Sequence, residues 1–173
     1  QQEYRKVVSR LDFIDDVIDK LESIRTTVLS QIREQVVGQM NTYYNQLIWK
    51  DTEYTIELNE DYQIAVLNEQ DQNQLGSLSA GETQVLALSF LSALSQISGF
   101  RAPILIDTPL ARISGQPKKH IASHLPEYLS DTQVTFLMTD EEYSSEVEGL
   151  LKNQVSNEYE LDFYDGSTEV TAR

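Results

Sequence analysis

The chain of 173 residues contains no cysteine and only two histidines, His120 and His124. Without cysteine, neither a disulfide framework nor a thiolate metal site can form. Two histidines are too few for a zinc site unless carboxylates complete it. No apolar run approaches the ~20 residues of a membrane-spanning helix, and no signal-like segment opens the chain. We therefore expect a cytoplasmic protein that makes no contact with a membrane.

Positive charge is also scarce, because 13 lysines and arginines stand against 28 aspartates and glutamates, giving a net charge of -15. A surface this acidic repels phosphate backbones, so the chain alone is a poor candidate for nucleic-acid binding. Most of the acid is explained by solvated faces. The chain begins at Gln1 rather than methionine, and we interpret it as a fragment or a trimmed piece.

Glycine and proline are absent before Gly38, and this stretch carries a heptad repeat. The apolar seam consists of Val7, Leu11, Ile14, Ile18, Leu21, Val28 and Ile32, with Arg25 interrupting it. Such spacing is typical of a coiled coil, and it predicts one helix from about residue 3 to about residue 48. A bundle helix packed within a globule is the alternative.

The rest of the chain has the pattern of an α/β domain. Period-two alternation in 53–58 and 62–67, around Asn59-Glu60-Asp61, predicts a β-hairpin. Further on we expect helices at 79–98, 116–129 and 141–152, and strands at 102–107, 133–138 and 158–164. Alternating strands and helices indicate a parallel sheet. The strand at 102–107 is apolar enough to be buried on both faces.

A polar segment, Ser79-Ala80-Gly81-Glu82, precedes the long apolar helix. Ser79 and Glu82 have the spacing of a capping box. Gly81 needs another reason, because glycine inside a helix costs about 1 kcal/mol relative to alanine. A phosphate group would supply one, since the missing side chain lets an anion approach the free amides of the first turn, where the Ser79 hydroxyl adds a hydrogen bond.

Polar residues also follow two predicted strands. Asp107 ends the strand in "ILIDTPLARIS", and Thr139-Asp140-Glu141-Glu142 follows the strand "QVTFLM". Open α/β sheets bind their ligands at the carboxyl ends of strands. A carboxylate there can hold hydrated Mg²⁺ beside a nucleotide. Asp107 could instead cap the next turn, and the acidic cluster could simply begin a helix.

Taken together, these segments resemble the ABC-type ATPases. "LSAGE" is similar to their signature motif, "ILIDTPLARIS" to the Walker B strand with its D-loop, and "LMTDEE" to the switch segment, in the same order. The order resembles the C-terminal lobe of an SMC-like head. Within that class, "IDTPLARIS", "TDEE" and the preceding "LIWKDTEYTIELNEDYQI" look most like the DndD-type ATPases of DNA phosphorothioation, a sulfur modification of DNA.

The resemblance implies a P-loop ATPase lobe at 51–173, preceded by a returning coiled-coil arm and base helix at 1–50. It implies ATP and Mg²⁺ as cofactors and a homodimer of heads that closes around ATP. Ser79, Ala80, Gly81 and Glu82 would contact the nucleotide on the partner head, together with Ser114 of the D-loop at 110–114. Asp107 would support Mg²⁺ through water.

Three positions depart from the common pattern of these ATPases. Thr108 stands where many relatives carry the glutamate that polarises the attacking water, and a threonine cannot act as that base at neutral pH. Thr139 stands at the switch histidine and Ser114 at the D-loop aspartate. The candidate catalytic residues are therefore Asp107, Thr108 and Thr139, with Glu141 or Glu142 as a speculative base.

No Gly-x-x-x-x-Gly-Lys-Ser/Thr sequence occurs in the chain, so it lacks the loop and lysine that cradle phosphates. The resemblance implies that an N-terminal lobe of the same protein supplies this Walker A loop. DNA would be bound by the assembled complex, beside other DNA-modification subunits. Two alternatives stay open: an ATP-gated DNA clamp or a repair or defence protein with little turnover, and an acidic coiled-coil adaptor without nucleotide.

Overall fold

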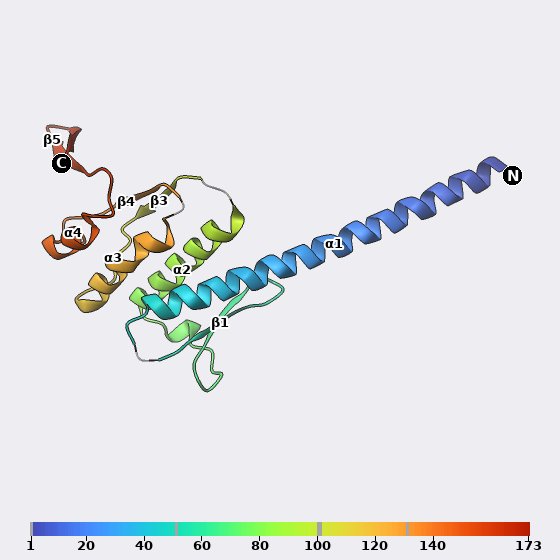
Figure 1. The fold of residues 1–173 in the computed structure, drawn as a ribbon, viewed down its shortest axis with the longest axis horizontal. Coiled ribbons are helices and arrows are strands. Elements are labelled where there is room, and N and C mark those ends of the chain that lie inside the picture. The colour runs from blue at the N-terminus through green and yellow to red at the C-terminus, as the bar shows by residue number, and fades with distance from the viewer. Residues whose placement is uncertain (1, 51, 100–101, 131) are drawn as a thin grey trace.

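The helix α1 spans Gln2–Leu47 and is the longest element of the molecule. The computed structural model describes residues 2–50, 52–99, 102–130 and 132–173. Figure 1 shows α1 as a single rod that projects far from the other elements, with the N-terminus at its distant end. The heptad pattern therefore predicted both the type and the extent of this element correctly.

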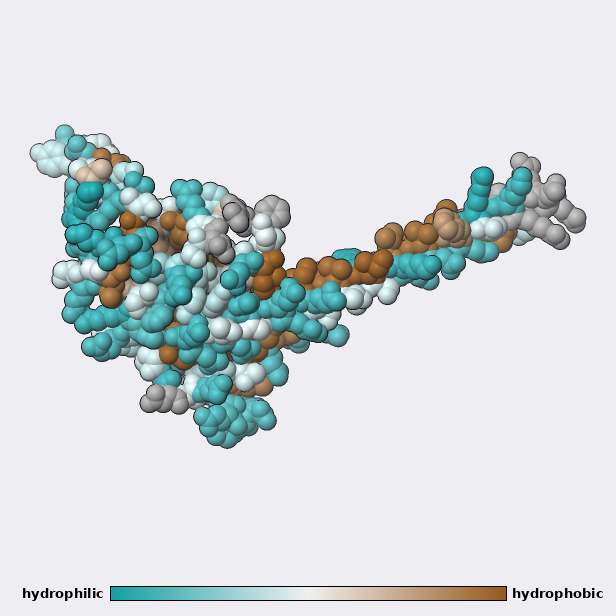
Figure 2. All heavy atoms as spheres, viewed as in Figure 1, coloured by the Kyte–Doolittle hydropathy of each residue, from teal (hydrophilic) through white to brown (hydrophobic). Residues whose placement is uncertain are grey.

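The two ends of α1 lie in different surroundings. Its seam residues are exposed to solvent, among them Leu11 at 54%, Leu21 at 60% and Ile32 at 43%, while the Val7 side chain lies outside the described residues. Figure 2 shows the seam as an apolar band along the rod. The last turns are instead buried, with Met40 and Leu47 at 0% exposure. The alternative of a helix packed within a globule is therefore wrong for the projecting part.

The buried end of α1 also holds the first strand. Strand β1 (Thr55–Leu58) pairs antiparallel with β2 (Ile64–Leu67), as the alternation predicted. Asn41 bonds both backbone groups of Ile56, accepting from its N–H at 2.6 Å and donating to its carbonyl at 2.9 Å. Asn45 does the same with Tyr54, at 3.0 and 2.8 Å. Two side chains of α1 thus take the place of a neighbouring strand.

A short 3-10 turn, η1 (Leu75–Ser77), leads into α2 (Ala80–Ser98). This helix lies beside the buried end of α1, and their contact forms the centre of the core, which includes Tyr44, Val85 and Leu88. It ends at Gly99, whose φ of +64° is the left-handed conformation that glycine adopts without strain. The predicted bounds of 79–98 are confirmed.

Strands β3 (Ile104–Asp107) and β4 (Val134–Leu137) form a parallel pair. Helix α3 (Gln116–Tyr128) connects them, and the shorter α4 (Ser145–Leu151) follows β4 and packs on α3. Parallel pairing with a helical crossover is confirmed. The prediction that β3 is buried on both faces is wrong, because Leu105 is 65% exposed. Among the described residues, none covers that face of the strand.

The last predicted strand belongs to a separate sheet. Strand β5 (Tyr159–Tyr164) pairs antiparallel with β6 (Ser167–Ala172), an element that the sequence analysis missed. Both faces of this hairpin are open, with Phe163 at 76% exposure on one face and its neighbour Tyr164 at 81% on the other. In Figure 1 it lies at the opposite end of the molecule from the tip of α1.

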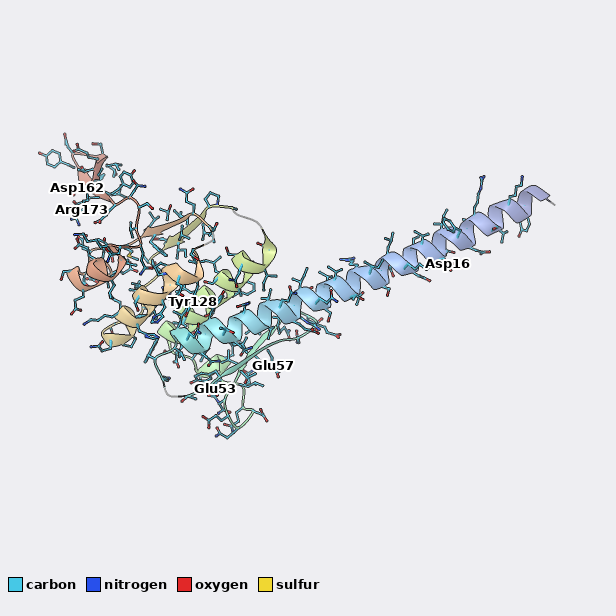
Figure 3. All side chains as sticks on the ribbon, in the orientation of Figure 1. Asp16, Glu53, Glu57, Tyr128, Asp162 and Arg173 are labelled. Atoms are coloured by element: carbon cyan, nitrogen blue, oxygen red, sulfur yellow. The ribbon has the colours of Figure 1, made fainter. Side chains whose placement is uncertain are left out.

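Acidic side chains occur over the whole length of the molecule. Figure 3 shows Asp16 on the projecting part of α1, Glu53 just before β1, Glu57 within β1, and Asp162 on the terminal hairpin next to Arg173. This distribution fits solvated faces rather than one acidic site. In the described part of the chain, no helix is both long and apolar enough to span a bilayer.

Candidate functional site

The start of α2 is a complete capping box. The Ser79 hydroxyl accepts the Glu82 N–H at 3.3 Å, and the Glu82 carboxylate accepts the Ser79 N–H at 2.9 Å. Ser79 and Ala80 are exposed, whereas Gly81 and Glu82 are buried. The exposed side of this first turn therefore offers a hydroxyl and the positive end of the helix dipole to a ligand.

The Glu82 carboxylate is neutralised by a lysine that follows α1. Lys50 Nζ lies 2.6 Å from Glu82 Oε1, and the Glu82 side chain is only 3% exposed. Burial raises the pKa of Glu82, but the hydrogen bonds from Lys50 and Ser79 outweigh it, and the pKa falls below its ordinary value. The same hydrogen bond raises the pKa of Lys50. A buried negative charge at the start of α2 is thus balanced within the chain.

Gly81 has a packing reason that the sequence did not reveal. A Cβ atom at this position would lie 3.2 Å from the Arg112 carbonyl oxygen, 3.2 Å from the Trp49 ring and 3.4 Å from Ile113. Two of these contacts are tighter than side chains normally accept, and one is to backbone. The glycine lets Trp49 and the loop after β3 pack directly on the first turn of α2. A phosphate is therefore not needed to explain Gly81.

Asp107 ends β3 with its side chain exposed. The next residue, Thr108, has a φ of +50°, which is unfavourable for a β-branched side chain. Its N–H donates to the Leu137 carbonyl at 2.8 Å, so the backbone leaves the sheet one residue after Asp107. The chain then turns back along α2 through the loop at 108–113.

Gln84 of α2 bonds this loop at two points. Its Nε2 donates to the Thr108 carbonyl at 2.8 Å, and its Oε1 accepts the Arg112 N–H at 3.4 Å. Both polar ends of one amide side chain are therefore used on the backbone of a single loop.

Glu142 holds the same loop from the other side. It is 1% exposed, and its Oε1 accepts the Leu110 N–H at 2.8 Å. Its Oε2 accepts the N–H and the hydroxyl of Thr139 at 3.1 and 3.2 Å. A carboxylate that is buried and bonded in this way is poorly placed to take a proton from an external water. Its position indicates that it joins the end of β4 to the loop after β3.

The structure brings the three predicted segments together. The start of α2, the loop after β3 and the segment after β4 are linked through Gly81, Gln84 and Glu142. Ser114, which follows the loop at 108–113, and Glu141, which precedes Glu142, are both exposed. The Glu141 carbonyl accepts a hydrogen bond from the Lys118 ammonium. In the described part of the chain, no group of three or more histidine, aspartate or glutamate side chains could hold a metal ion. Asp107 would therefore need oxygen ligands from water and from a phosphate to hold Mg²⁺.

The sequence analysis missed Lys50 and Gln84 in this region, and it named Glu142 only as a speculative base. Thr139 and Glu142 have the spacing of a capping box, so the role of Glu142 had a readable signal. Lys50 and Gln84 had none, because their partners lie 32 and 24 residues away and meet them only in the folded chain.

Known proteins resemble the chain in fold only. It matches no protein-family model and no curated protein. Among solved structures, it is similar to one from a study of ATP-driven dimerization and DNA-stimulated activation of SMC ATPases, with a TM-score of 0.65, 14% identity and coverage of 85% of this chain and 88% of that one.

Two archaeal and bacterial structures extend this likeness. The Smc head domain of Pyrococcus yayanosii, with a coiled coil and joint, gives a TM-score of 0.74 at 16% identity, covering 97% of this chain and 32% of that one. The SMC head domain of Thermotoga maritima gives a TM-score of 0.56 at 16% identity, covering 81% and 48%. This chain thus spans less than half of either protein. The long helix, the small sheets and the flanking helices are the fold of the C-terminal lobe of an SMC-type head.

Proposed function

We propose that this chain is the C-terminal part of an SMC-like ATPase head, in which two heads close around ATP and Mg²⁺. The observation that carries the proposal is the convergence of the α2 N-terminus, the loop after Asp107 and the segment after β4 at one place. The solved structures of similar fold support it, since one comes from work on ATP-driven dimerization of SMC ATPases.

The residue roles follow from exposure and charge. Ser79 and Ala80, with the amide of Gly81, would meet a γ-phosphate held on the partner head. The Glu82 carboxylate would repel that phosphate if it were free, but Lys50 at 2.6 Å neutralises it. Ser114, exposed at the end of the loop, would cross to the partner head.

Asp107 would support Mg²⁺ through water from the end of β3. Thr108 and Thr139 would line the reacting site without acting as bases. Because Glu142 is 1% exposed and bonded to Leu110 and Thr139, we assign it to holding the loop. Glu141, which is exposed, is then the better candidate base of the two.

A second lobe would complete the head. The β3 and β4 pair has an open face at Leu105, and the β5 and β6 hairpin exposes Leu161 and Phe163. Exposed apolar patches of this kind mark interaction surfaces. An N-terminal lobe with the Walker A loop would cover them and hold the phosphates, and the exposed seam of α1 would pair with an outgoing arm.

The finer assignment is to DNA phosphorothioation. It rests on the wording of "IDTPLARIS" and "TDEE", which looks most like the DndD-type ATPases. In that role the assembled complex would contact DNA together with other DNA-modification subunits. The net charge of -15 means that basic surface must come from those partners.

The test is phosphate release by this chain mixed with the N-terminal lobe of its own gene. Wild type and Asp107→Ala are compared at the same Mg²⁺ and ATP concentrations, with ATP binding measured in parallel. We expect Mg²⁺-dependent turnover that Asp107→Ala abolishes. Turnover equal in both forms would contradict the role of Asp107, and no ATP binding by wild type would contradict the proposal.

An ATP-gated clamp is the second candidate. It is favoured by Thr108, Thr139 and Ser114, which stand where the related ATPases commonly carry glutamate, histidine and aspartate. Such a protein would bind ATP and join its heads with negligible turnover, whether its role is modification, repair or defence. Bound ATP without phosphate release in the same experiment would identify it.

A further inference from the structure

Gln84 links the helix that begins at the signature-like segment to the loop that follows Asp107. Its two hydrogen bonds, 2.8 Å to the Thr108 carbonyl and 3.4 Å from the Arg112 N–H, fall four residues apart on one loop. The side chain is half-buried and comes from the second turn of α2. Since an α-helix is rigid over such a distance, a displacement of Ser79 displaces Gln84 as well.

The loop that Gln84 holds is strained. Thr108 keeps a φ of +50°, which a β-branched residue rarely adopts and which persists only when its surroundings enforce it. The Thr108 N–H bond to Leu137 fixes one side of this residue, and Gln84 fixes its carbonyl on the other. Without the amide of Gln84, the Thr108 carbonyl keeps only the long 3.4 Å bond from Ala111.

We propose that Gln84 is a positioning residue. It couples the position of the first turn of α2 to the backbone conformation at Thr108, and thereby sets the position of the attacking water. This rests on the proposed function, in which Ser79 meets the γ-phosphate of the partner head. Gln84 itself touches no nucleotide. It acts through the Thr108 carbonyl and the Arg112 amide.

The first experiment measures amide hydrogen exchange in this chain without nucleotide, so it does not depend on ATPase activity. Gln84→Ala should raise the exchange rate of the amides at 110–113 about tenfold, because a bond to a strained loop is lost. Gln84→Glu keeps an acceptor for Arg112 but cannot donate to Thr108, and it should raise exchange as well. Unchanged exchange in Gln84→Ala would overturn the inference.

The matched control is Gln96→Ala. Gln96 lies on the same helix and accepts a hydrogen bond from the Tyr43 hydroxyl at 2.6 Å, away from the loop. This variant therefore removes a hydrogen-bonded glutamine side chain from α2 but leaves the contacts of residues 108–113 unchanged. Exchange of the loop amides should stay at the wild-type rate in this variant.

The second experiment uses the complete head with its N-terminal lobe. Gln84→Ala should lower kcat about tenfold with KM for ATP unchanged, since misplacement of a reacting group affects turnover and not nucleotide binding. Gln96→Ala should leave both constants unchanged. A rise in KM with kcat unchanged, or no effect in an active head, would overturn the inference. A wild-type head that binds no ATP would instead contradict the proposed function, and the exchange result would still decide whether Gln84 holds the loop.

Discussion

Lys50 determines which charge the start of α2 carries. The Lys50 side chain is 46% exposed, while the Glu82 side chain that its ammonium contacts is 3% exposed. A carboxylate taken from water at such a depth is costly unless a partner and hydrogen bonds compensate it. Here Lys50 and the Ser79 N–H do so together. The first turn therefore combines a buried carboxylate, paired with a half-exposed lysine, with an exposed outer surface that carries no net charge.

We predict that Lys50→Met lowers the free energy of unfolding by about 2 kcal/mol at pH 7, a value reduced for the exposure of Lys50. The wild-type pKa of Glu82 is below its ordinary value, so its contribution is present above that value and is lost as the pH falls through the folded pKa. In the variant, burial raises the pKa instead, and protonation relieves the penalty. The difference between the two proteins should narrow toward pH 4, as measured by urea unfolding.

Lys119→Met is the control for this change. Lys119 pairs with Glu146 at 2.8 Å, but the Glu146 side chain is 63% exposed. An exposed pair of this kind contributes about 0 to 1 kcal/mol. An equal loss in both variants, or a difference that widens in acid, would show that Glu82 is not held by Lys50.

Residue-level features were predictable where they depend on neighbours in sequence. Ser79 and Glu82 form the capping box that their spacing indicates. Gly81 was assigned to phosphate, whereas its close contacts are Trp49 and Arg112, 32 and 31 residues away. No local pattern predicts which distant side chain fills the space that a glycine leaves.

At the scale of elements, the two parts of α1 contribute differently to the stability of this chain, because one part is exposed and the other is buried. Leu21 is 60% exposed and belongs to the seam, whereas Leu47 is 0% exposed and lies in the core. The heptad repeat could be read from the sequence over the first part. The change of role near Val36 could not, because apolar spacing is similar in a coiled coil and in a buried helix.

We predict that Leu47→Ala and Leu21→Ala differ sharply in this chain. Leu47→Ala should cost about 2 to 5 kcal/mol, since it removes buried methyl groups and leaves a cavity. Leu21→Ala should change the free energy of unfolding by no more than about 0.5 kcal/mol. Urea unfolding, followed by the fluorescence of the single tryptophan, Trp49, measures both. A comparable loss in the two variants would mean that the seam is already covered in this chain.

The strands show where sequence reasoning fails. The β1 and β2 hairpin was predictable because alternation and its turn lie within a few residues. For β5, the strand was predicted but its partner β6 was not, because the residues of Ser167–Ala172 are mostly polar and exposed. The open face at Leu105 was equally hidden, because an apolar residue reads as buried whether or not its cover belongs to the same chain.

For the whole molecule, the proposed closure of two heads gives a test at the exposed face of α2. Ser79→Arg should abolish ATP-driven dimerisation of the complete head, because a long cation would occupy the place of the phosphate and the partner. The measurement is sedimentation velocity with and without ATP. Loss of the cap itself should cost about 1 kcal/mol of stability.

Ser144→Arg separates these two effects. Ser144 caps α4, accepting the Val147 N–H, and lies outside the candidate site. This variant loses a helix cap of the same kind, and its heads should still dimerise with ATP. Dimerisation that survives Ser79→Arg, or that fails equally in both variants, would contradict the placement of the signature-like segment at the seam between heads.

The bonds from Asn41 and Asn45 to β1 fix how the rod can move. Four residues along a helix rise about 6 Å, and two residues along a strand advance about 6.6 Å. Because these two spacings are nearly equal, Asn45 can bond Tyr54 while Asn41 bonds Ile56. Sliding or rotating α1 by a single residue would break all four bonds at once. Torque that reaches the head along the rod is therefore passed to the β1 and β2 hairpin, and the two turn as one rigid lever.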